Sequence, residues 1–253
     1  MLQSIIWTEL KRSMTRRTLC MALLLPLIIL LQFNQVRTGY VFLTWQGVFE
    51  ESAGTIIAVA FPLLCCVLYL PTVAREIDHQ FIRYARTRVS LKDYLIAKGV
   101  VNALITFTVF FVTMLGWMLF LRFVEPSLHW MTYEQGPESL TTFTQVFTTD
   151  GMYMLAYAGW IGLNAMVYAT IAYLLLVLSG NLFLAVGLPF LFYHLLNFAT
   201  GLLSAPQFSP ISTIFPFNII AMPLWTIFVP FSVLGLMLIG LMITGVKRTE
   251  WEL

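Results

Sequence analysis

Three polar side chains stand within long apolar stretches of this 253-residue chain, where they could act on a bound molecule. His194 and Asn197 are three residues apart and therefore share one face of a helix, and Asn164 lies in an earlier part of the apolar sequence. Such side chains could line a path for a transported molecule, or they could form hydrogen bonds between packed helices. The residue types alone leave both interpretations open.

Sequence motifs for enzymatic chemistry are absent. The chain has no GxxxxGK[ST] loop for nucleotide phosphates, no HExxH zinc motif and no GxSxG nucleophile turn. Its three cysteines lie in apolar runs without the spacing of a metal site. We therefore expect no catalytic residue, no metal and no cofactor in this chain. The net charge of +2 gives no indication of nucleic-acid binding.

Basic residues gather in one short stretch. Residues 75–98 hold six of the fourteen Lys and Arg of the chain. A polar segment this short, between two apolar runs of membrane-spanning length, indicates a cytoplasmic loop. Within it, Ile77, Phe81 and Ile82 alternate with polar residues as in an amphipathic helix, and Ser90 is suited to cap a second helix that continues into the next apolar run. The segment could dock in a groove of a partner protein, or it could be a passive topology anchor.

The composition indicates that a membrane surrounds these residues. Hydrophobic residues make up 59% of the chain and charged residues 10%, whereas soluble domains are roughly one quarter charged. Uncharged runs and helix breakers predict six helices of membrane-spanning length in one all-α domain over residues 1–253. The predicted spans are 18–36, 52–74, 99–121, 152–178, 182–203 and 224–246, and residues 122–151 form an exterior loop.

Two further segments contact the membrane without crossing it. Leu2, Ile6 and Leu10 recur every four residues within 1–17, which predicts an amphipathic helix on the membrane surface, although a plain basic flank is the alternative. The Pro-rich segment 204–223 contains an apolar piece, residues 211–222, that is too short to cross the membrane and too apolar to lie freely in water. It is predicted to be an exterior re-entrant segment, with an exterior loop bearing exposed aromatics as the alternative.

Charge sets the orientation of the spans. With both termini in the cytoplasm, twelve of the fourteen basic residues lie inside, which gives a net charge of +6 inside and −4 outside. No Asp, Glu, Lys or Arg lies within the six predicted spans. Chains that place a charge in the membrane generally use it for ion or proton coupling. The pattern therefore argues against a proton-driven transporter, and energy is expected to arrive from outside the membrane.

The pattern resembles the ABC-2 family of ATP-binding-cassette export permeases. The resembling features are the surface helix, six spans with both ends inside, and the Pro-rich segment between spans five and six. Arg75-Glu76, Arg83, Arg86 and the run Ser90-x3-Tyr94-x3-Lys98 look like the loop that follows the second span in that family. His79 departs from the family pattern, which often has Gly a few residues after the Glu.

The resemblance implies a permease subunit in a bacterial cell membrane, paired with a second copy or a homologue. Separate P-loop ATPase subunits would bind ATP and Mg²⁺ and dock on the cytoplasmic side. The contact residues would be Arg75, Glu76, Asp78, His79, Phe81, Ile82, Arg83 and Arg86.

Uncharged spans fit an amphipathic or lipid-like substrate, such as a membrane-active peptide, a drug or a lipid. The alternative function is a membrane-embedded immunity, sensory or binding subunit without transport of its own. An intramembrane enzyme would depend on His194 and Asn197 alone.

Overall fold

The computed structural model describes residues 2–79, 90–134, 142–216 and 222–251. Within these ranges every regular element is a helix, and the only extended pairing is an isolated bridge between Phe42 and Tyr133. The all-α prediction is confirmed for this part of the chain.

Six helical segments are long and apolar enough to cross a membrane, as the sequence predicted. These segments are α2 with α3 (Arg16–Ala22, Leu24–Gly39), α5 with α6 (Ile56–Val67, Leu70–Asp78), α8 with η1 and α9 (Leu91–Leu119, Phe120–Val124, Glu125–Leu128), α11 (Asp150–Ser179), α12 (Leu182–Leu202), and η3 with α14 (Leu224–Ile227, Phe228–Trp251). Their length and composition indicate a membrane-embedded protein.

Prolines divide the first two spans. A proline lacks the N–H that would bond the carbonyl four residues earlier, and its ring clashes with that carbonyl. Helix α2 ends at Ala22, four residues before Pro26, and α5 ends at Val67, four residues before Pro71. Both interruptions therefore follow from local sequence.

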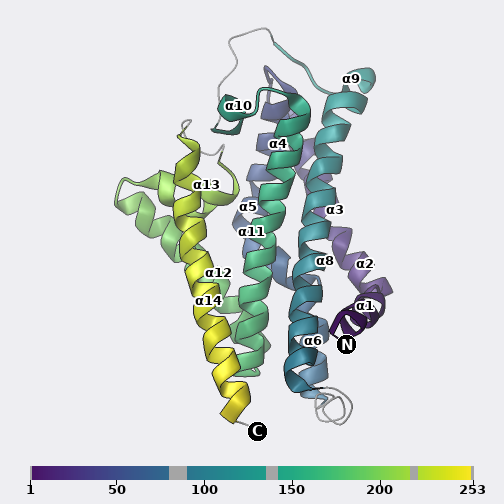
Figure 1. Cartoon of the computed structure of the whole chain (residues 1–253). Coiled ribbons are helices and arrows are strands. Elements are labelled where there is room, and N and C mark those ends of the chain that lie inside the picture. Colours follow the sequence, from purple (N-terminus) through teal and green to yellow (C-terminus); the bar gives the residue numbers. More distant parts are fainter. Residues whose placement is uncertain (1, 80–89, 135–141, 217–221, 252–253) are drawn as a thin grey trace.

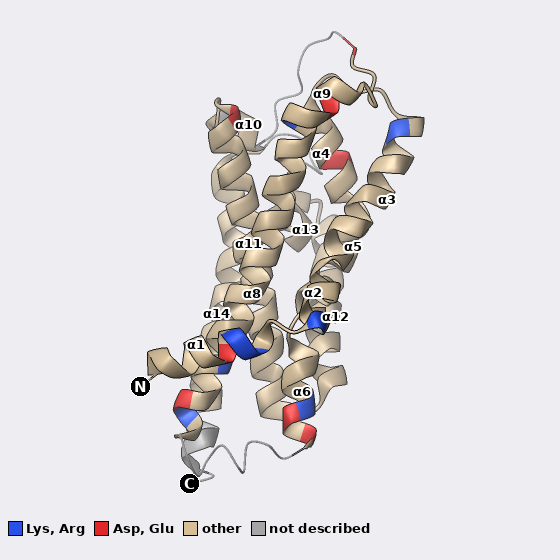
Figure 2. Ribbon diagram, turned by 90° about the vertical axis from the view of Figure 1, so that its right-hand side faces the viewer, with Lys and Arg blue, Asp and Glu red and all other residues tan. Residues whose placement is uncertain are grey.

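The N-terminal helix α1 (Leu2–Ser13) is shorter than predicted and lies across the end of the bundle (Figures 1 and 2). The predicted extent to residue 17 is wrong, because Thr15 begins a new helix: its Oγ1 accepts a hydrogen bond from the Thr18 N–H at 3.2 Å. Helix α1 packs against α8, and Ile6 and Leu10 contact a buried cluster of the bundle. Part of its apolar face therefore packs on protein.

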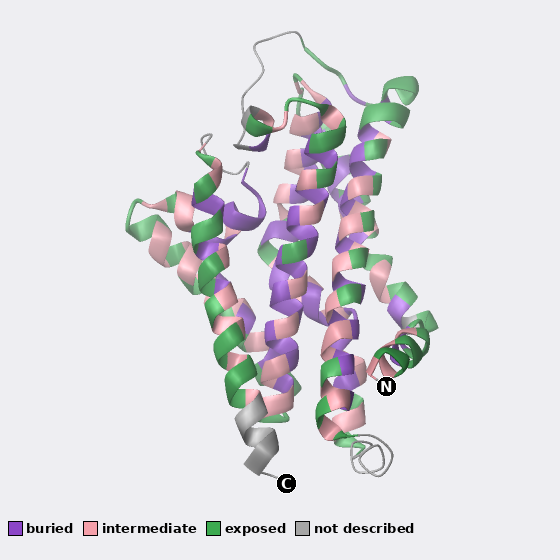
Figure 3. Cartoon of the chain, viewed as in Figure 1, coloured by how far each residue is buried: buried purple, intermediate pink, exposed green. Residues whose placement is uncertain are grey.

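Helix α11 is the centre of the bundle, and it packs against α5, α8, α12 and α14. Within an apolar stretch of 18 residues, 61% of α11 is buried inside the chain, whereas the same measure for α12 is 17%. Figure 3 shows this contrast between the inner helix and the largely exposed α12 and α14. Gly162 allows α11 to approach α8 closely, because a Cβ there would lie 3.3 Å from the Phe107 carbonyl oxygen.

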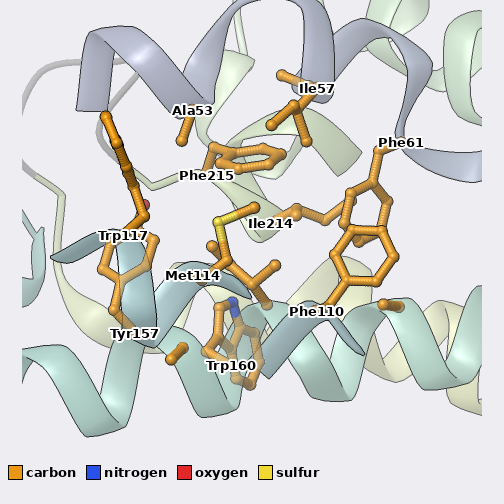
Figure 4. Packing of buried hydrophobic residues seen from close by; sticks show 14 of the residues in the cluster. Ala53, Ile57, Phe61, Phe110, Met114, Trp117, Tyr157, Trp160, Ile214 and Phe215 are labelled. Carbon is orange, nitrogen blue, oxygen red and sulfur yellow. The ribbon is translucent and has the colours of Figure 1, made fainter. Parts of the chain in front are cut away.

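The Pro-rich segment turns back into the core. It contains η2 (Pro206–Phe208) and α13 (Pro210–Ile214), followed by Phe215. Phe215 is fully buried, and its ring lies 5.9 Å from that of Phe61 (Figure 4). The alternative of a loop with exposed aromatics therefore does not hold for Phe215. Residues 217–221 lie outside the described ranges, and the depth of the segment in a membrane stays a prediction.

Both ends of the chain lie at the same end of the bundle, where α1 starts and α14 finishes (Figure 1). The other end carries α4 (Trp45–Gly54), α9 and α10 (Thr142–Val146). Charged positions gather at these two ends, and the ribbon between them is almost uncharged (Figure 2). Which end faces the cytoplasm stays a prediction from the basic residues.

Candidate functional site

Helices α6 and α8 flank the central part of the basic stretch. Helix α6 ends at Asp78 and α8 begins at Leu91. The Ser90 Oγ accepts a hydrogen bond from the Asp93 N–H at 3.1 Å and so caps α8. The predicted cap and the continuous helix into the third span are confirmed. Residues 91–98 are therefore helical rather than part of a loop that extends to residue 98.

Lys98 is the centre of a buried charge cluster where α1 crosses the bundle. The Lys98 side chain is about 2% exposed, and its Nζ forms ion pairs with Oε1 of Glu9 and, at 2.5 Å, with Oε2 of Glu76. Glu9 belongs to α1, Glu76 to α6 and Lys98 to α8. One ammonium group thus joins three elements. We call these three residues the Lys98 cluster.

Two tyrosines complete the surroundings of the cluster. Tyr69 donates a hydrogen bond to Glu9 Oε1 at 3.3 Å, and Tyr94 donates one to Glu76 Oε2 at 3.1 Å. Lys98 Nζ lies 5.0 Å from the Tyr94 ring centre, within the range of cation–π attraction. Ser90, Tyr94 and Lys98 are four residues apart, which places them along one face of α8.

The charges of the cluster nearly balance. Glu9 and Glu76 carry two negative charges against the one positive charge of Lys98, and Arg12 Nη2 lies 3.4 Å from Glu76 Oε1 at the more exposed edge. An ion pair with an exposed partner, such as Arg12 with Glu76, contributes at most about 1 kcal/mol to the stability of the fold. Removal of one partner from a buried pair costs about 3–5 kcal/mol, because the other charge stays buried without compensation. The loss of any one of these partners would therefore destabilise the contact between the three elements.

The predicted partner-binding residues fall into three groups. Arg75, Asp78 and His79 are exposed at the end of α6, where a partner could reach them. Glu76 is turned inward, since both of its carboxylate oxygens are bonded within the chain. The other four lie outside the described residues, so their helix stays a prediction: Phe81, Ile82, Arg83 and Arg86.

The predicted path-lining residues behave differently from one another. Asn197 Oδ1 accepts a hydrogen bond from the Ile211 N–H at 2.9 Å, so it has the structural role of tying α12 to α13. The buried Asn164 Oδ1 and His194 Nε2 have no hydrogen-bond partner among the described residues. No hydrogen bond joins the three side chains in that part of the structure. Of the three predicted path-lining residues, Asn164 and His194 each have a buried polar atom without a partner among the described residues.

Neither the Lys98 cluster nor the burial of Lys98 and Glu9 was predicted from the sequence. Lys98 was assigned to a cytoplasmic loop, although its four-residue spacing from Tyr94 and Ser90 places it on one face of a helix. Glu9 had no sequence signal, since it is 89 residues from Lys98 along the chain. Lys98 and Glu9 lie outside the predicted spans, so the prediction of spans without Asp, Glu, Lys or Arg is unchanged, but the burial of these two side chains was not predicted.

No group of three or more His, Cys, Asp or Glu side chains that could hold a metal ion occurs in the described ranges. The chain matches no family model, no curated protein and no solved structure.

Proposed function

We propose that this chain is the transmembrane permease subunit of an ATP-driven ABC exporter. The six apolar helices and the resemblance of residues 75–98 to the loop of ABC-2 permeases support this proposal. In it, the chain forms the path for an amphipathic or lipid-like substrate in the cell membrane. A second permease copy or homologue completes the path, and a separate P-loop ATPase binds ATP and Mg²⁺.

The Lys98 cluster is the observation that carries the proposal. It joins α1 to both helices that flank residues 79–90. A partner that pushes on this segment would therefore move α6 and α8 together, and α1 would follow. Nucleotide-dependent contacts could then shift the population of two arrangements of the spans, provided that the partner binds one arrangement better than the other.

The uneven burial of the outer helices fits a larger assembly. Within an apolar stretch of 18 residues, only 17% of α12 is buried inside the chain, and only 22% of the span that contains α14. Their exposed apolar surface needs lipid or a second subunit to cover it, since water is a poor solvent for it. Asn164 Oδ1 and His194 Nε2 are buried in this arrangement of the helices, so they would meet a substrate only in a second arrangement of the spans.

Copurification tests the proposal directly. The chain is extracted in mild detergent from its native membranes, and we expect a P-loop ATPase to accompany it in near-equal amount. The double variant Arg83→Glu, Arg86→Glu should release the ATPase and abolish ATP-dependent export while membrane insertion is retained. Arg37→Glu is the control, because Arg37 lies in the last turn of α3, against the Trp130 ring, and the end of α3 is far from the ends of α6 and α8 that flank residues 79–90.

Two results would contradict the proposal. The first is the absence of any ATPase even after gentle crosslinking. The second is undiminished ATPase binding in the double variant. In either case an immunity, sensory or binding subunit becomes the leading function, because the chain would then lack a source of energy for transport.

A further inference from the structure

An open pocket of about 400 Å³ lies at the end of the bundle opposite the Lys98 cluster. Its walls come from the start of α4, from η1 and from the start of α11, three elements far apart in the sequence. Figure 1 shows α4 and the upper part of α11 side by side at this end. The residues that line the pocket include Leu43, Trp45, Arg122, Tyr133 and Asp150.

One ion pair crosses the wall of the pocket. Arg122 Nε lies 2.7 Å from Asp150 Oδ2, and both side chains are nearly half exposed. The pair occupies Nε, so the two Nη groups of the guanidinium remain available to a ligand: within the described ranges, Asp150 is the only partner of Arg122. The pocket therefore offers N–H donors beside a carboxylate.

Hydrogen bonds outside the pocket hold the segment around Tyr133, which forms another part of its wall. Glu125 is fully buried and accepts hydrogen bonds from the Met131 N–H at 2.8 Å and from the Tyr133 hydroxyl at 2.9 Å. Burial, and then the hydrogen bond to Glu125, raise the pKa of Tyr133, so its hydroxyl stays protonated and donates to Glu125. Tyr133 also lines the pocket. Backbone bonding between Glu134 and Phe42 holds the same segment. A ligand would meet a preformed surface.

The backbone around Arg122 is unusual. Arg122 lies in η1, a π-helical turn over Phe120–Val124 that interrupts the α-helical bonding between α8 and α9. Single π-helical turns inside α-helices occur frequently at functional sites. Phe123 and Val124 in the same turn are exposed, as is Leu43 on the pocket wall. An apolar surface thus continues from the pocket onto the outside of the bundle.

We propose that this pocket binds the headgroup of a phospholipid that carries a phosphate and a primary amine, as phosphatidylethanolamine does. Arg122 donates its Nη hydrogens to the phosphate, since a guanidinium matches an oxyanion in shape and charge. Asp150 accepts from the ammonium group, which also lies against the Trp45 and Tyr133 rings. The acyl chains run along the exposed apolar residues of η1.

The pocket favours a zwitterionic headgroup, because its wall carries one positive and one negative side chain, Arg122 and Asp150. A purely anionic headgroup would place its phosphate beside the Asp150 carboxylate with no ammonium group to compensate, and like charges at short range disfavour binding. A water-soluble molecule with the same phosphate and amine shares the recognition chemistry. The inference does not depend on transport, because it uses only contacts at this end of the bundle.

Native mass spectrometry of the purified, delipidated chain tests the proposal. The chain is titrated with phosphatidylethanolamine, phosphatidylglycerol or glycerophosphoethanolamine, and we expect a preference for the first. Arg122→Gln and Asp150→Asn should each weaken its binding roughly tenfold, as expected for the loss of one charged hydrogen bond. Arg37→Gln is the matched control, because Arg37 lies at the same end of the bundle against the Trp130 ring, outside the pocket.

A second test uses the wild-type chain, so it does not depend on whether a variant folds. Phosphatidylethanolamine should slow the modification of Arg122 by phenylglyoxal several-fold and leave that of Arg37 unchanged. Equal binding of the ethanolamine and glycerol lipids, or equal losses in Arg122→Gln and Arg37→Gln, would overturn the proposal. Glycerophosphoethanolamine binding as tightly as the lipid would support the zwitterion site and identify its ligand as a soluble one.

Discussion

The ammonium group of Lys98 lies where almost no water reaches it, so the chain itself must provide the compensation that water would give. Two carboxylates and two tyrosine rings supply it. The compensation is mutual, because Glu9 and Glu76 in turn need the ammonium group. A side chain in this position therefore cannot be replaced without consequences on two other helices.

Lys98→Met tests this mutual dependence. The change keeps most of the apolar stem and leaves two carboxylates without their main cation, so we expect unfolding to become easier by about 3–5 kcal/mol. Thermal unfolding in detergent measures the loss. Lys92→Met is the control, since Lys92 is exposed six residues earlier on α8, and it should change stability by less than about 0.5 kcal/mol. Equal shifts in the two variants would show that the cluster contributes nothing.

Neutralising the two carboxylates distinguishes the contribution of charge to stability from that of packing. In the background of Lys98→Met, the further changes Glu9→Gln and Glu76→Gln remove the two charges left unpaired. We expect part of the lost stability to return, because replacement of a whole buried ion-pair group is often close to neutral. If stability falls further instead, the Lys98 site depends on shape and hydrogen bonding rather than on charge.

Contacts between elements depend on a few small residues. Helices α8 and α11 form the largest packed pair of the bundle, and Gly162 and Gly99 mark two close approaches between them. At Gly162 an added Cβ would come within 3.0 Å of the Phe107 ring and 3.3 Å of the Phe107 carbonyl oxygen. The backbone oxygen cannot move aside as a side chain can, so the two helices would have to separate.

Gly162→Ala should therefore destabilise the bundle by about 1–3 kcal/mol, the usual cost of overpacking. Gly159 lies three residues earlier on α11 and has open space where its Cβ would be. Gly159→Ala should leave stability unchanged or raise it by up to about 1 kcal/mol, because alanine has the higher helix propensity. Chemical or thermal unfolding compares the two. A Gly162→Ala variant as stable as the Gly159→Ala variant would contradict the close approach of α8 and α11.

Much of the element order could be predicted from the sequence, because local chemistry sets it. Uncharged runs give the six long helices, Pro26 and Pro71 explain where two of them break, and Ser90 explains where α8 begins. The Lys98 cluster could not be predicted in the same way. Which carboxylate meets Lys98 depends on where α1 crosses the bundle, and that position results from packing between distant parts of the chain.

At the scale of the whole molecule, charge separates the bundle into two polar ends and an almost uncharged middle (Figure 2). One end holds the Lys98 cluster, and the other holds the Arg122–Asp150 pair and the buried Glu125. The segment containing α13 breaks this pattern, because it returns from an end into the core. Trp160 supports it there by donating its Nε1 hydrogen to the Thr213 carbonyl oxygen at 2.6 Å.

Cysteine labelling in intact cells tests both the orientation and the buried segment. In a background with Cys20, Cys65 and Cys66 replaced, Leu203→Cys, Ile214→Cys and Lys92→Cys are each treated with a membrane-impermeant maleimide. Leu203 is 77% exposed just after α12, so it should react from outside, whereas the fully buried Ile214 should react only after unfolding. Lys92 is exposed at the opposite end and should react only once the membrane is permeabilised. Labelling of Lys92→Cys in intact cells would reverse the orientation predicted from the basic residues, and rapid labelling of Ile214→Cys would contradict the packing of α13 in the core.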